Sequence, residues 1–377
     1  MQTMVLLIGN YPPDQQQSMH RFGTMLLQGL TDAGVTAELV RPTPVFGNFR
    51  LAGAFIAKWL GYIDKFILFP RQLRKKIALR PALVHICDHS NAMYVKYTGG
   101  IPAVVTCHDL LAVRGALGEE TDCPASRSGK RLQRWILAGL RRARAVVCVS
   151  HATLADAKRL LLSEAGGPKL TVATLGLNYP YRKLLPDEAV ARMKLNGLDP
   201  STPFVLHVGS NLRRKNREGA VRMLALSKDK WNGRIVFAGD PVTASMHSLG
   251  RDLGVADRIV EVRYPDNELL EALYNCATAL LYPSRFEGFG WPVAEAQACG
   301  CPVICSDIGP LPEVGGEAVL MHQVDDEEGF ATDIVRLANP AEREHWSEKS
   351  LRNAARFDTK KMIAQYLEIY RSLTPQL

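Results

Sequence analysis

Short β-branched and apolar runs alternate with helical patterns along the whole 377-residue chain. This alternation is typical of parallel sheets whose strands are connected by crossover helices. Six strand candidates lie in the first half, at residues 5–9, 37–41, 83–87, 103–107, 145–150 and 170–174. Six more lie in the second half, at residues 204–209, 234–239, 258–262, 277–282, 302–306 and 318–321. The pattern predicts an α/β protein with two doubly wound sheets.

A chain of this length is expected to divide, because a single hydrophobic core stops growing at around 250 to 300 residues. Between the two sets of strand candidates, residues 175–187 carry Pro180 and Pro186 with little periodicity, which is typical of a linker. Near the end of the chain, apolar residues from Met362 to Tyr370 recur at helical spacing. We predict domains at residues 1–177 and 178–356, followed by a helical segment at residues 357–377.

The composition is that of an ordinary globular protein, with 47% hydrophobic and 22% charged residues. Most of the eight cysteines lie in apolar runs, which predicts reduced thiols and a cytoplasmic protein. Residues 1–9 have no basic leader and are expected to form a buried strand. The longest apolar stretch, residues 51–69, is interrupted by Lys58, Asp64 and Lys65, so we expect no membrane-spanning segment.

The net charge of +8 is distributed unevenly. Residues 1–180 contain 22 Lys and Arg against 11 Asp and Glu, whereas the remainder contains 24 against 27. A basic surface suits an anionic membrane or a phosphate-bearing acceptor, and an ordinary solvated surface is the alternative. Nucleic acid is not expected as a partner, because the cations are not interleaved with the aromatic residues that stack on bases.

An apolar stretch too broken to span a bilayer is followed by clustered cations in this basic half. The cations are Arg71, Arg74, Lys75, Lys76 and Arg80. This order predicts peripheral contact with an anionic membrane surface, such as the inner face of the cell membrane. The alternative is an ordinary helix that covers the sheet.

Residues 283–300, PSRFEGFGWPVAEAQACG, follow an apolar strand candidate and are expected to open a helix at Pro292. Gly288 and Gly290, on either side of Phe289, allow the backbone to come close to a ligand. The N–H groups at the start of the helix favour a diphosphate. The loop is therefore predicted to bind an anion.

Glu287 and Glu295 flank this loop with seven residues between them. Since carboxylates repel a phosphate, we expect them to accept hydrogen bonds from sugar hydroxyls. Glu295 is expected in the first turn of the helix, where stabilisation of the helix macrodipole is the alternative interpretation.

A cationic segment follows the strand candidate at residues 204–209, which ends at Gly209 and is followed by Ser210. Arg213, Arg214 and Lys215 are three successive cations that can neutralise a diphosphate and stabilise the charge that grows on it as a sugar departs. The sequence leaves open whether Arg213 or Arg214 meets the diphosphate.

Together these features resemble the retaining glycosyltransferases of family 4, which have the GT-B fold. The resemblance rests on Glu287-x7-Glu295 with its Gly-Phe-Gly loop, on Arg214-Lys215, and on the segments at 175–178, 267–274 and 356–358. It covers essentially the whole chain and is strong from residue 204 to 315. It implies two Rossmann-like domains that face each other across a cleft, with a C-terminal helix that crosses back to the N-terminal domain.

The resemblance also implies roles for residues of the N-terminal, acceptor-binding domain. It implies that His108 contacts the donor sugar near its reacting carbon. The alternative is that Asp109 caps the next helix and His108 is merely adjacent to it. A paired-glycine loop of the family falls on Gln17 and Ser18, whose side chains can donate hydrogen bonds to a phosphate or an acceptor hydroxyl.

A metal site is not expected. His85, Cys87 and His89 suggest a metal site, but the chain has no Asp-x-Asp pair. We therefore predict a metal-independent enzyme without a cofactor.

The predicted function is transfer of a hexose from a UDP- or GDP-sugar to a glycan or lipid-linked acceptor, with retention of configuration, in cell-surface polysaccharide synthesis. The expected catalytic residues are His108, Glu287, Arg214 and Lys215, and the expected donor-binding residues are Gly209, Ser210, Gly288, Phe289, Gly290 and Glu295. Two alternatives remain: a GT-B nucleotide-sugar epimerase, which needs a further acid/base pair, and a non-catalytic module that binds nucleotide sugars.

Overall fold

The computed structural model describes residues 4–14, 16–47, 54–164 and 166–377, without the side chains of residues 54–58. Residues 1–3 of the predicted first strand, and residues 51–53 of the apolar stretch, lie outside the described residues. The chain divides into two compact units. Unit 1 comprises Met1–Asn178 together with Thr359–Leu377, and unit 2 comprises Tyr179–Asp358.

Unit 1 contains a sheet of six parallel strands in the order β2-β1-β3-β4-β5-β6. The strands are β1 (Met4–Ile8), β2 (Thr36–Val40), β3 (Leu83–Ile86), β4 (Ala103–Cys107), β5 (Ala145–Cys148) and β6 (Lys169–Val172). The four central strands β1, β3, β4 and β5 are buried along their whole length. Such continuous burial is expected of parallel strands, because crossover helices cover both faces of their sheet.

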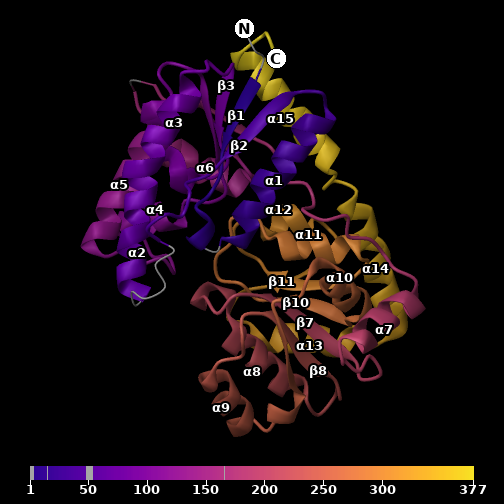
Figure 1. Ribbon diagram of the computed structural model, residues 1–377. Coiled ribbons are helices and arrows are strands. Elements are labelled where there is room, and N and C mark those ends of the chain that lie inside the picture. The colour runs from indigo at the N-terminus through magenta and orange to yellow at the C-terminus, as the bar shows by residue number, and fades with distance from the viewer. Residues whose placement is uncertain (1–3, 15, 48–53, 165) are drawn as a thin grey trace. The chain divides into compact units, whose positions relative to one another are not determined.

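Helical segments surround this sheet on both faces, as Figure 1 shows. They are η1 (Pro12–Asp14), α1 (Gln17–Asp32), α2 (Ala54–Ile63), η2 (Asp64–Leu68), α3 (Phe69–Ile77), η3 (His89–Tyr97), α4 (Leu111–Ala116), α5 (Arg127–Arg142), α6 (His151–Leu161) and α15 (Thr359–Leu373). The main core of unit 1 combines strand residues such as Leu6, Ile86 and Val105 with helix residues such as Leu73 and Leu140.

Helix α15 packs beside α1 although more than 300 residues separate them in the sequence. Its apolar stripe is buried, and it also closes a polar network in the core. The hydroxyl of Tyr370 lies 2.5 Å from Nδ1 of His85, and the hydroxyl of Tyr366 lies 2.9 Å from Oγ1 of Thr106. His85 Nε2 is 2.8 Å from the same Thr106 oxygen. The last helix of the chain is therefore part of the core of unit 1.

The predicted apolar stretch forms three consecutive helical segments, α2, η2 and α3. Asp64, at the start of η2, is fully buried and accepts hydrogen bonds from the Tyr11 hydroxyl and from the N–H groups of residues 45–47. Because each of these donors stabilises the ionised carboxylate, the pKa of Asp64 is lowered although burial alone would raise it. Among the described residues, no helix is long and apolar enough to cross a membrane.

Unit 2 contains a second sheet of six parallel strands in the order β12-β11-β10-β7-β8-β9. The strands are β7 (Phe204–Gly209), β8 (Arg234–Gly239), β9 (Ile259–Arg263), β10 (Ala279–Tyr282), β11 (Val303–Ser306) and β12 (Leu320–His322). The predicted α/β fold with two six-stranded parallel sheets is thus confirmed, and no strand end differs from its prediction by more than two residues.

The helical segments of unit 2 are α7 (Pro186–Leu195), η4 (Arg213–Lys215), α8 (Arg217–Ser227), α9 (Ala244–Asp252), η5 (Ala256–Arg258), α10 (Asn267–Cys276), α11 (Trp291–Ala298), α12 (Leu311–Gly315), α13 (Glu327–Arg336) and α14 (Pro340–Ala354). Val205, Phe237 and Leu281 of the sheet pack with Phe330 and Ile334 of α13 in one core. In parallel sheets, ligands bind at the carboxyl ends of the strands. The loops after β7 and β10 therefore hold the candidate site.

Candidate functional site

A buried ionic cluster joins the loop after β7 to the loop after β10. The Nζ atom of Lys215 lies 2.5 Å from Oε1 of Glu287, and Nη1 of Arg214 lies 3.1 Å from Oε2 of the same carboxylate. The hydroxyl of Tyr282, the last residue of β10, donates to Glu287 Oε1 at 2.7 Å and accepts from Lys215 Nζ at 2.6 Å. The structure thus brings together Arg214, Lys215 and Glu287, three residues that the sequence places in two separate motifs.

Each ionisable group in this cluster is shifted by its neighbours. Burial alone would raise the pKa of Glu287, but the charges of Lys215 and Arg214 outweigh it and lower that pKa to about 2. Burial lowers the pKa of Lys215, and the carboxylate of Glu287 opposes this effect. Burial also raises the pKa of the Tyr282 hydroxyl, which therefore keeps its proton. Glu287 is consequently an ionised hydrogen-bond acceptor at neutral pH.

Backbone contacts hold the two loops in register. The N–H of Arg285 donates to the carbonyl of Arg214 at 2.7 Å, and Arg214 Nη1 donates to the carbonyl of Phe286 at 3.1 Å. Gly209 ends β7 beside the apolar stem of Lys215, and Ser210 follows it partly exposed. Arg213 is exposed and lines a cavity of unit 2 that lies outside the cluster. Of Arg213 and Arg214, it is Arg214 that contacts Glu287.

The glycine-rich loop leads directly into α11. Gly288 is partly exposed, whereas Phe289 is buried with its ring 6.0 Å from that of Phe357. Gly290 is the N-cap of α11 and has a φ of 97°, a conformation that L side chains rarely adopt. A β-carbon here would also lie 2.6 Å from Leu311 Cδ2, so the turn requires glycine.

The position of Glu295 differs from the expectation. The macrodipole interpretation requires Glu295 in the first turn of α11. Because α11 begins at Trp291, one residue before Pro292, Glu295 lies beyond that turn. Its side chain is buried and accepts a hydrogen bond from the Tyr274 hydroxyl of α10 at 2.9 Å. The macrodipole effect falls off within the first turn, so it accounts for Glu295 poorly.

Two tyrosines and a histidine of unit 2 were missed from the sequence. Tyr282 and Tyr274 each donate a hydroxyl to one of the two glutamates. His207 is fully buried under the loop, with Nε2 3.0 Å from the carbonyl of Lys215. Only their places, at the end of a strand and inside predicted elements, could have singled them out, and buried tyrosines are common in any core.

In unit 1, His108 follows β4 and is 6% exposed. Its Nε2 lies 3.0 Å from the carbonyl oxygen of Cys87, and its ring meets that of Phe22 edge to face at 4.9 Å. Since a carbonyl can only accept, Nε2 carries the proton and Nδ1 is the acceptor. Burial lowers the pKa of His108, so the imidazole is neutral at pH 7.

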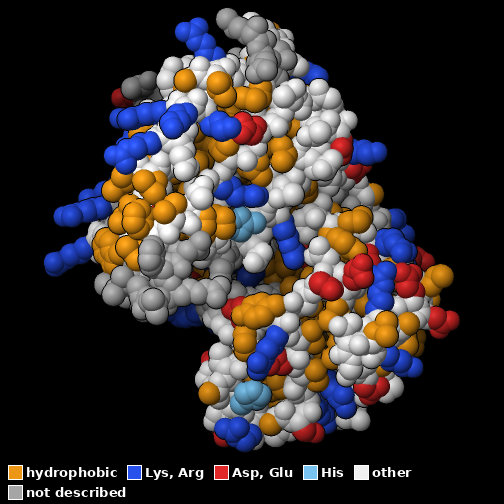
Figure 2. All heavy atoms as spheres, viewed as in Figure 1, with side chains coloured by type: hydrophobic (Ala, Val, Ile, Leu, Met, Phe, Trp, Pro, Cys, Tyr) orange, Lys and Arg blue, Asp and Glu red, His pale blue; other side chains and the backbone are white. Residues whose placement is uncertain are grey.

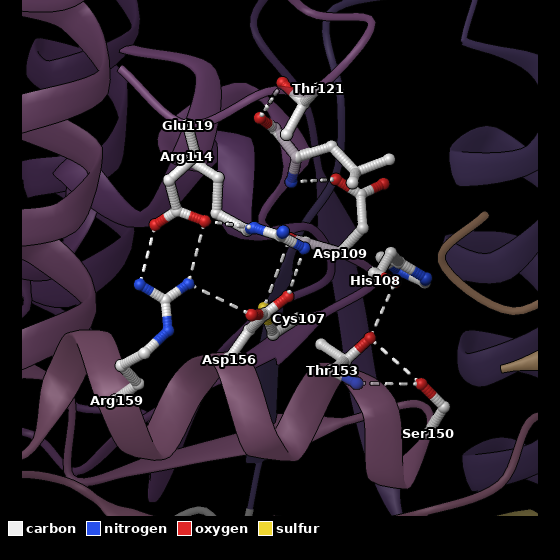
Figure 3. Close-up of polar contacts among 11 residues, drawn as sticks. Cys107, His108, Asp109, Arg114, Glu119, Thr121, Ser150, Thr153, Asp156 and Arg159 are labelled. Carbon is white, nitrogen blue, oxygen red and sulfur yellow. Dashed lines mark hydrogen bonds and ion pairs between the residues drawn. The ribbon is translucent and has the colours of Figure 1, made fainter. Parts of the chain in front are cut away.

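Further contacts, of the His108 backbone and of Asp109, come from the segments that follow β4 and β5 (Figure 3). The Thr153 hydroxyl donates to the His108 carbonyl at 3.4 Å, and Ser150 caps α6 by accepting from the Thr153 N–H. Asp109 accepts from the N–H of Leu111 at 3.0 Å, so its carboxylate does bond to the start of α4. The side chain of His108 points away from the nearby ion pairs of Arg114 and Arg159 with Glu119 and Asp156.

A polar cluster near His108 was also missed from the sequence. Asp88 follows β3 and is buried, and it accepts hydrogen bonds from Asn10 Nδ2 at 2.6 Å and from the Ser90 hydroxyl at 2.5 Å. Nδ1 of His89 is 3.1 Å from Asp88, and this neighbour raises the pKa of His89 against the larger effect of burial. A signal existed in the sequence, because Asn10 and Asp88 each directly follow a predicted strand.

Gln17 and Ser18 are the first two residues of α1, and both are exposed. The helix has no side-chain cap, because the N-cap is Gln16, whose side chain accepts from Asn10. For the metal interpretation, His85 bonds to Tyr370 whereas His89 lies beside Asp88. The described residues contain no group of three or more His, Cys, Asp or Glu that could hold a metal ion.

Two family models match the sequence: Glycosyl transferases group 1 over residues 192–353, and Glycosyltransferase Family 4 over residues 21–165. The chain belongs to glycosyltransferase family 4. The Escherichia coli O-antigen chain mannosyltransferase B is 30% identical to this family 4 protein over 178 residues, 45% of this chain and 46% of that one. A D-inositol 3-phosphate glycosyltransferase of Acidothermus cellulolyticus is 29% identical over 296 residues, 72% of this chain and 62% of that one. The match spans about half to three fifths of these relatives.

Solved glycosyltransferases have the same fold as this family 4 protein. Sucrose-phosphate synthase from Thermosynechococcus elongatus matches all of both chains with a TM-score of 0.79 at 22% identity. The Anabaena protein HepE, in complex with UDP and glucose, matches with a TM-score of 0.73 at 15% identity over 98% of this chain and 100% of its own. WaaG, a glycosyltransferase involved in lipopolysaccharide biosynthesis, has a TM-score of 0.71 at 15% identity over 97% and 99%. The fold is therefore GT-B.

Proposed function

We propose that this family 4 protein transfers a hexose from a nucleotide diphosphate sugar to a glycan or lipid-linked acceptor, with retention of configuration, in cell-surface polysaccharide synthesis. The observation that carries the proposal is the buried cluster of Arg214, Lys215 and Glu287 beside the N-terminus of α11. Two cations and a helix N-terminus suit a diphosphate, and an ionised carboxylate suits sugar hydroxyls. HepE, which shares the fold, was solved with UDP-glucose, which supports a UDP-sugar as donor.

In this proposal the cluster stabilises the leaving group. As the bond to the sugar breaks, negative charge grows on the diphosphate, and Lys215 and Arg214 are held in place by Glu287 before that happens. Glu287 cannot serve as a general acid near neutral pH, because its pKa is about 2. Its assigned role is to accept hydrogen bonds from hydroxyls of the donor sugar.

Glu295 and His108 are assigned to other parts of the donor. Tyr274 fixes the carboxylate of Glu295 by its hydrogen bond, and a fixed carboxylate is suited to the ribose hydroxyls. The neutral His108 donates through Nε2 to the Cys87 carbonyl, which leaves Nδ1 to accept from a sugar hydroxyl. Gln17 and Ser18 remain assigned to the acceptor or a phosphate because of their exposure at the start of α1.

A donor screen tests the proposed function. The purified protein is incubated with UDP-, GDP- and ADP-sugars without acceptor, and release of free nucleotide diphosphate is recorded. We expect slow hydrolysis of a UDP-sugar. Formation of an epimer would instead identify an epimerase, and tight nucleotide binding without turnover of any donor would identify a non-catalytic binding module.

We further propose that unit 1 makes peripheral contact with anionic membranes, where a lipid-linked acceptor lies. Trp59 and Ile67 are 51% and 48% exposed, and Arg71, Arg74 and Lys75 of α3 are exposed near them in the sequence. Figure 2 shows hydrophobic and cationic side chains next to each other on the visible face of unit 1.

The structure changes which cations matter for this contact. Two cations that the sequence grouped with the others are left out. Lys76 pairs with Glu38 at 2.5 Å, and Arg80 lies beyond the end of α3. Each cation near an anionic surface contributes about 1 kcal/mol, screened by salt, so three give reversible attachment and no anchor.

Flotation with phosphatidylserine vesicles measures this attachment. We expect binding at low salt that disappears at high salt and in a triple variant with Glu at Arg71, Arg74 and Lys75. The matched control places Glu at three exposed cations of unit 2, Lys194, Lys230 and Arg251, with the same change of charge. Equal loss in both variants would show a non-specific charge effect, and no flotation of the wild type would point to a soluble acceptor.

A further inference from the structure

Unit 2 has a cavity of about 380 Å³ whose lining does not include Lys215 or Glu287. This volume lies in the range of roughly 300 to 1,000 Å³ that is usual for small-molecule sites. Four arginines line the cavity, namely Arg213, Arg217, Arg222 and Arg285. Arginine is the side chain that best matches a phosphate group, because its planar fork donates two parallel hydrogen bonds.

Arg217 is the residue that most needs a ligand. It is the first residue of α8 and only 5% exposed, and its guanidinium carbon lies 4.7 Å from the centre of the Phe237 ring. One nitrogen, Nη1, donates to the Pro241 carbonyl at 3.3 Å and to the Asn211 side chain. Nε and Nη2 are buried and have no hydrogen-bond partner within the described residues. Leaving buried charged donors unpaired is costly, so an acceptor is expected at this position.

Two helices begin at the cavity. Asn216 is the N-cap of α8 but makes no side-chain capping hydrogen bond, and its buried Nδ2 also lacks a partner in the described part of the chain. Thr243, the N-cap of α9, lines the cavity as well. The partial positive charges of both helix N-termini add to those of the arginines.

Several carboxylates lie near these arginines. Arg222 pairs with Glu327 at 2.7 Å, and Arg285 pairs with Asp325 at 3.1 Å. Glu218 is the one carboxylate among the lining residues found in the structure, and it is exposed. Asp240 and Glu261 also lie close enough to Arg217 to act on it electrostatically, but neither accepts a hydrogen bond from its Nε or Nη2. Arg217 therefore lacks a hydrogen-bond acceptor rather than a counter-charge.

The cavity is separate from the donor cluster although η4 contributes to both. Arg214 and Lys215 contact Glu287, whereas their neighbour Arg213 lines the cavity. We propose that this cavity is a second anion site of unit 2, which binds the phosphate group of free phosphate or of a small phosphorylated molecule.

Calorimetric titration with sodium phosphate, at an ionic strength held constant with chloride, tests the proposal. The wild type should bind phosphate, and Lys215→Met, which alters only the donor cluster, should bind it within twofold as tightly. Arg217→Met should bind at least tenfold more weakly, with its thermal unfolding checked in parallel. A parallel titration with glucose 6-phosphate identifies the source, because the phosphorylated molecule binds more tightly only if the cavity also holds its sugar.

Two substitutions at exposed positions keep the test independent of the stability of the Arg217 variant. Glu218→Gln removes the lining carboxylate and should tighten phosphate binding severalfold, and Arg213→Ala should weaken it severalfold. Phosphate binding that is lost in Lys215→Met would place the anion in the donor cluster and overturn the proposal. So would binding that neither the Glu218 nor the Arg213 substitution alters.

Discussion

Replacing Lys215 with methionine separates electrostatic stabilisation of the leaving group from the packing of the same side chain. Methionine keeps the apolar stem that runs beside Gly209 and removes the ammonium group, which lies 2.5 Å from Glu287 and 2.6 Å from the Tyr282 hydroxyl. A single preorganised donor that faces developing charge contributes about 2.7 to 4 kcal/mol to the transition state. We therefore expect kcat to fall by roughly a hundredfold to a thousandfold.

The stability of this variant should change much less than its activity. Glu287 keeps Arg214 at 3.1 Å and the Tyr282 hydroxyl at 2.7 Å, so its charge is not left unpaired. The loss should stay below the roughly 3 to 5 kcal/mol that follows when a buried ion pair loses one partner entirely. With fewer cations nearby, the pKa of Glu287 should rise from about 2.

The assay is the initial rate of nucleotide diphosphate release from the donor that the screen identifies. Values of kcat and KM are fitted separately, because loss of transition-state stabilisation lowers kcat whereas loss of uniform binding raises KM. Lys230→Met, at an exposed lysine of the same unit, is the matched control. A kcat within fivefold of the wild type, in a folded Lys215→Met protein, would refute the assignment of Lys215 to the leaving group.

Two further predictions follow from buried side chains. Glu287→Ala should abolish turnover and largely keep the affinity for nucleotide diphosphate, whereas Glu295→Ala should weaken that affinity. Calorimetric titration measures the affinity of each variant. Equal losses of affinity in both variants would contradict the two roles. Burial lowers the pKa of His85 to about 3 in the folded protein, below its value near 6.5 in the unfolded chain. The unfolded chain therefore binds a proton before the folded protein does. The free energy of unfolding should fall as the pH drops from about 6.5 to about 3. The free energy of unfolding changes by at most about 1.4 kcal/mol per pH unit for one such group. Urea unfolding between pH 7 and 4.5 should show a smaller slope for His85→Asn than for the wild type. An unchanged slope would show that other groups cause the pH dependence.

The elements of the fold were predictable because parallel strands buried on both faces give continuous apolar runs. All of β4, β7 and β8 coincide with their predictions, and no strand end elsewhere moved by more than two residues. The start of α11 shows what such a shift does. Proline marked the first turn but not its first residue, and that single residue moved Glu295 out of the first turn.

The donor cluster was predictable in its charges and not in its pairing. Three cations in a row carry no sign of which two turn toward Glu287, since that depends on the turn of η4 and on the contact of its backbone with Arg285. Asp88 and Tyr282 were marked only by their places at strand ends. Their roles depend also on Asn10 and Lys215, which are far away in the sequence, and local patterns do not report such partners.

The discontinuity of unit 1 has a consequence for the order in which the chain is completed during synthesis. All of unit 2, residues 179–358, leaves the ribosome before α15 does, so the domain with the ionic cluster can close while unit 1 still lacks a helix. Until α15 arrives, His85 and Thr106 have each other but neither tyrosine hydroxyl, and the apolar patch beneath α15 is open to water. During that interval the sheet of unit 1, with all six strands present but not yet covered by α15, is the part of the protein that most needs protection from aggregation.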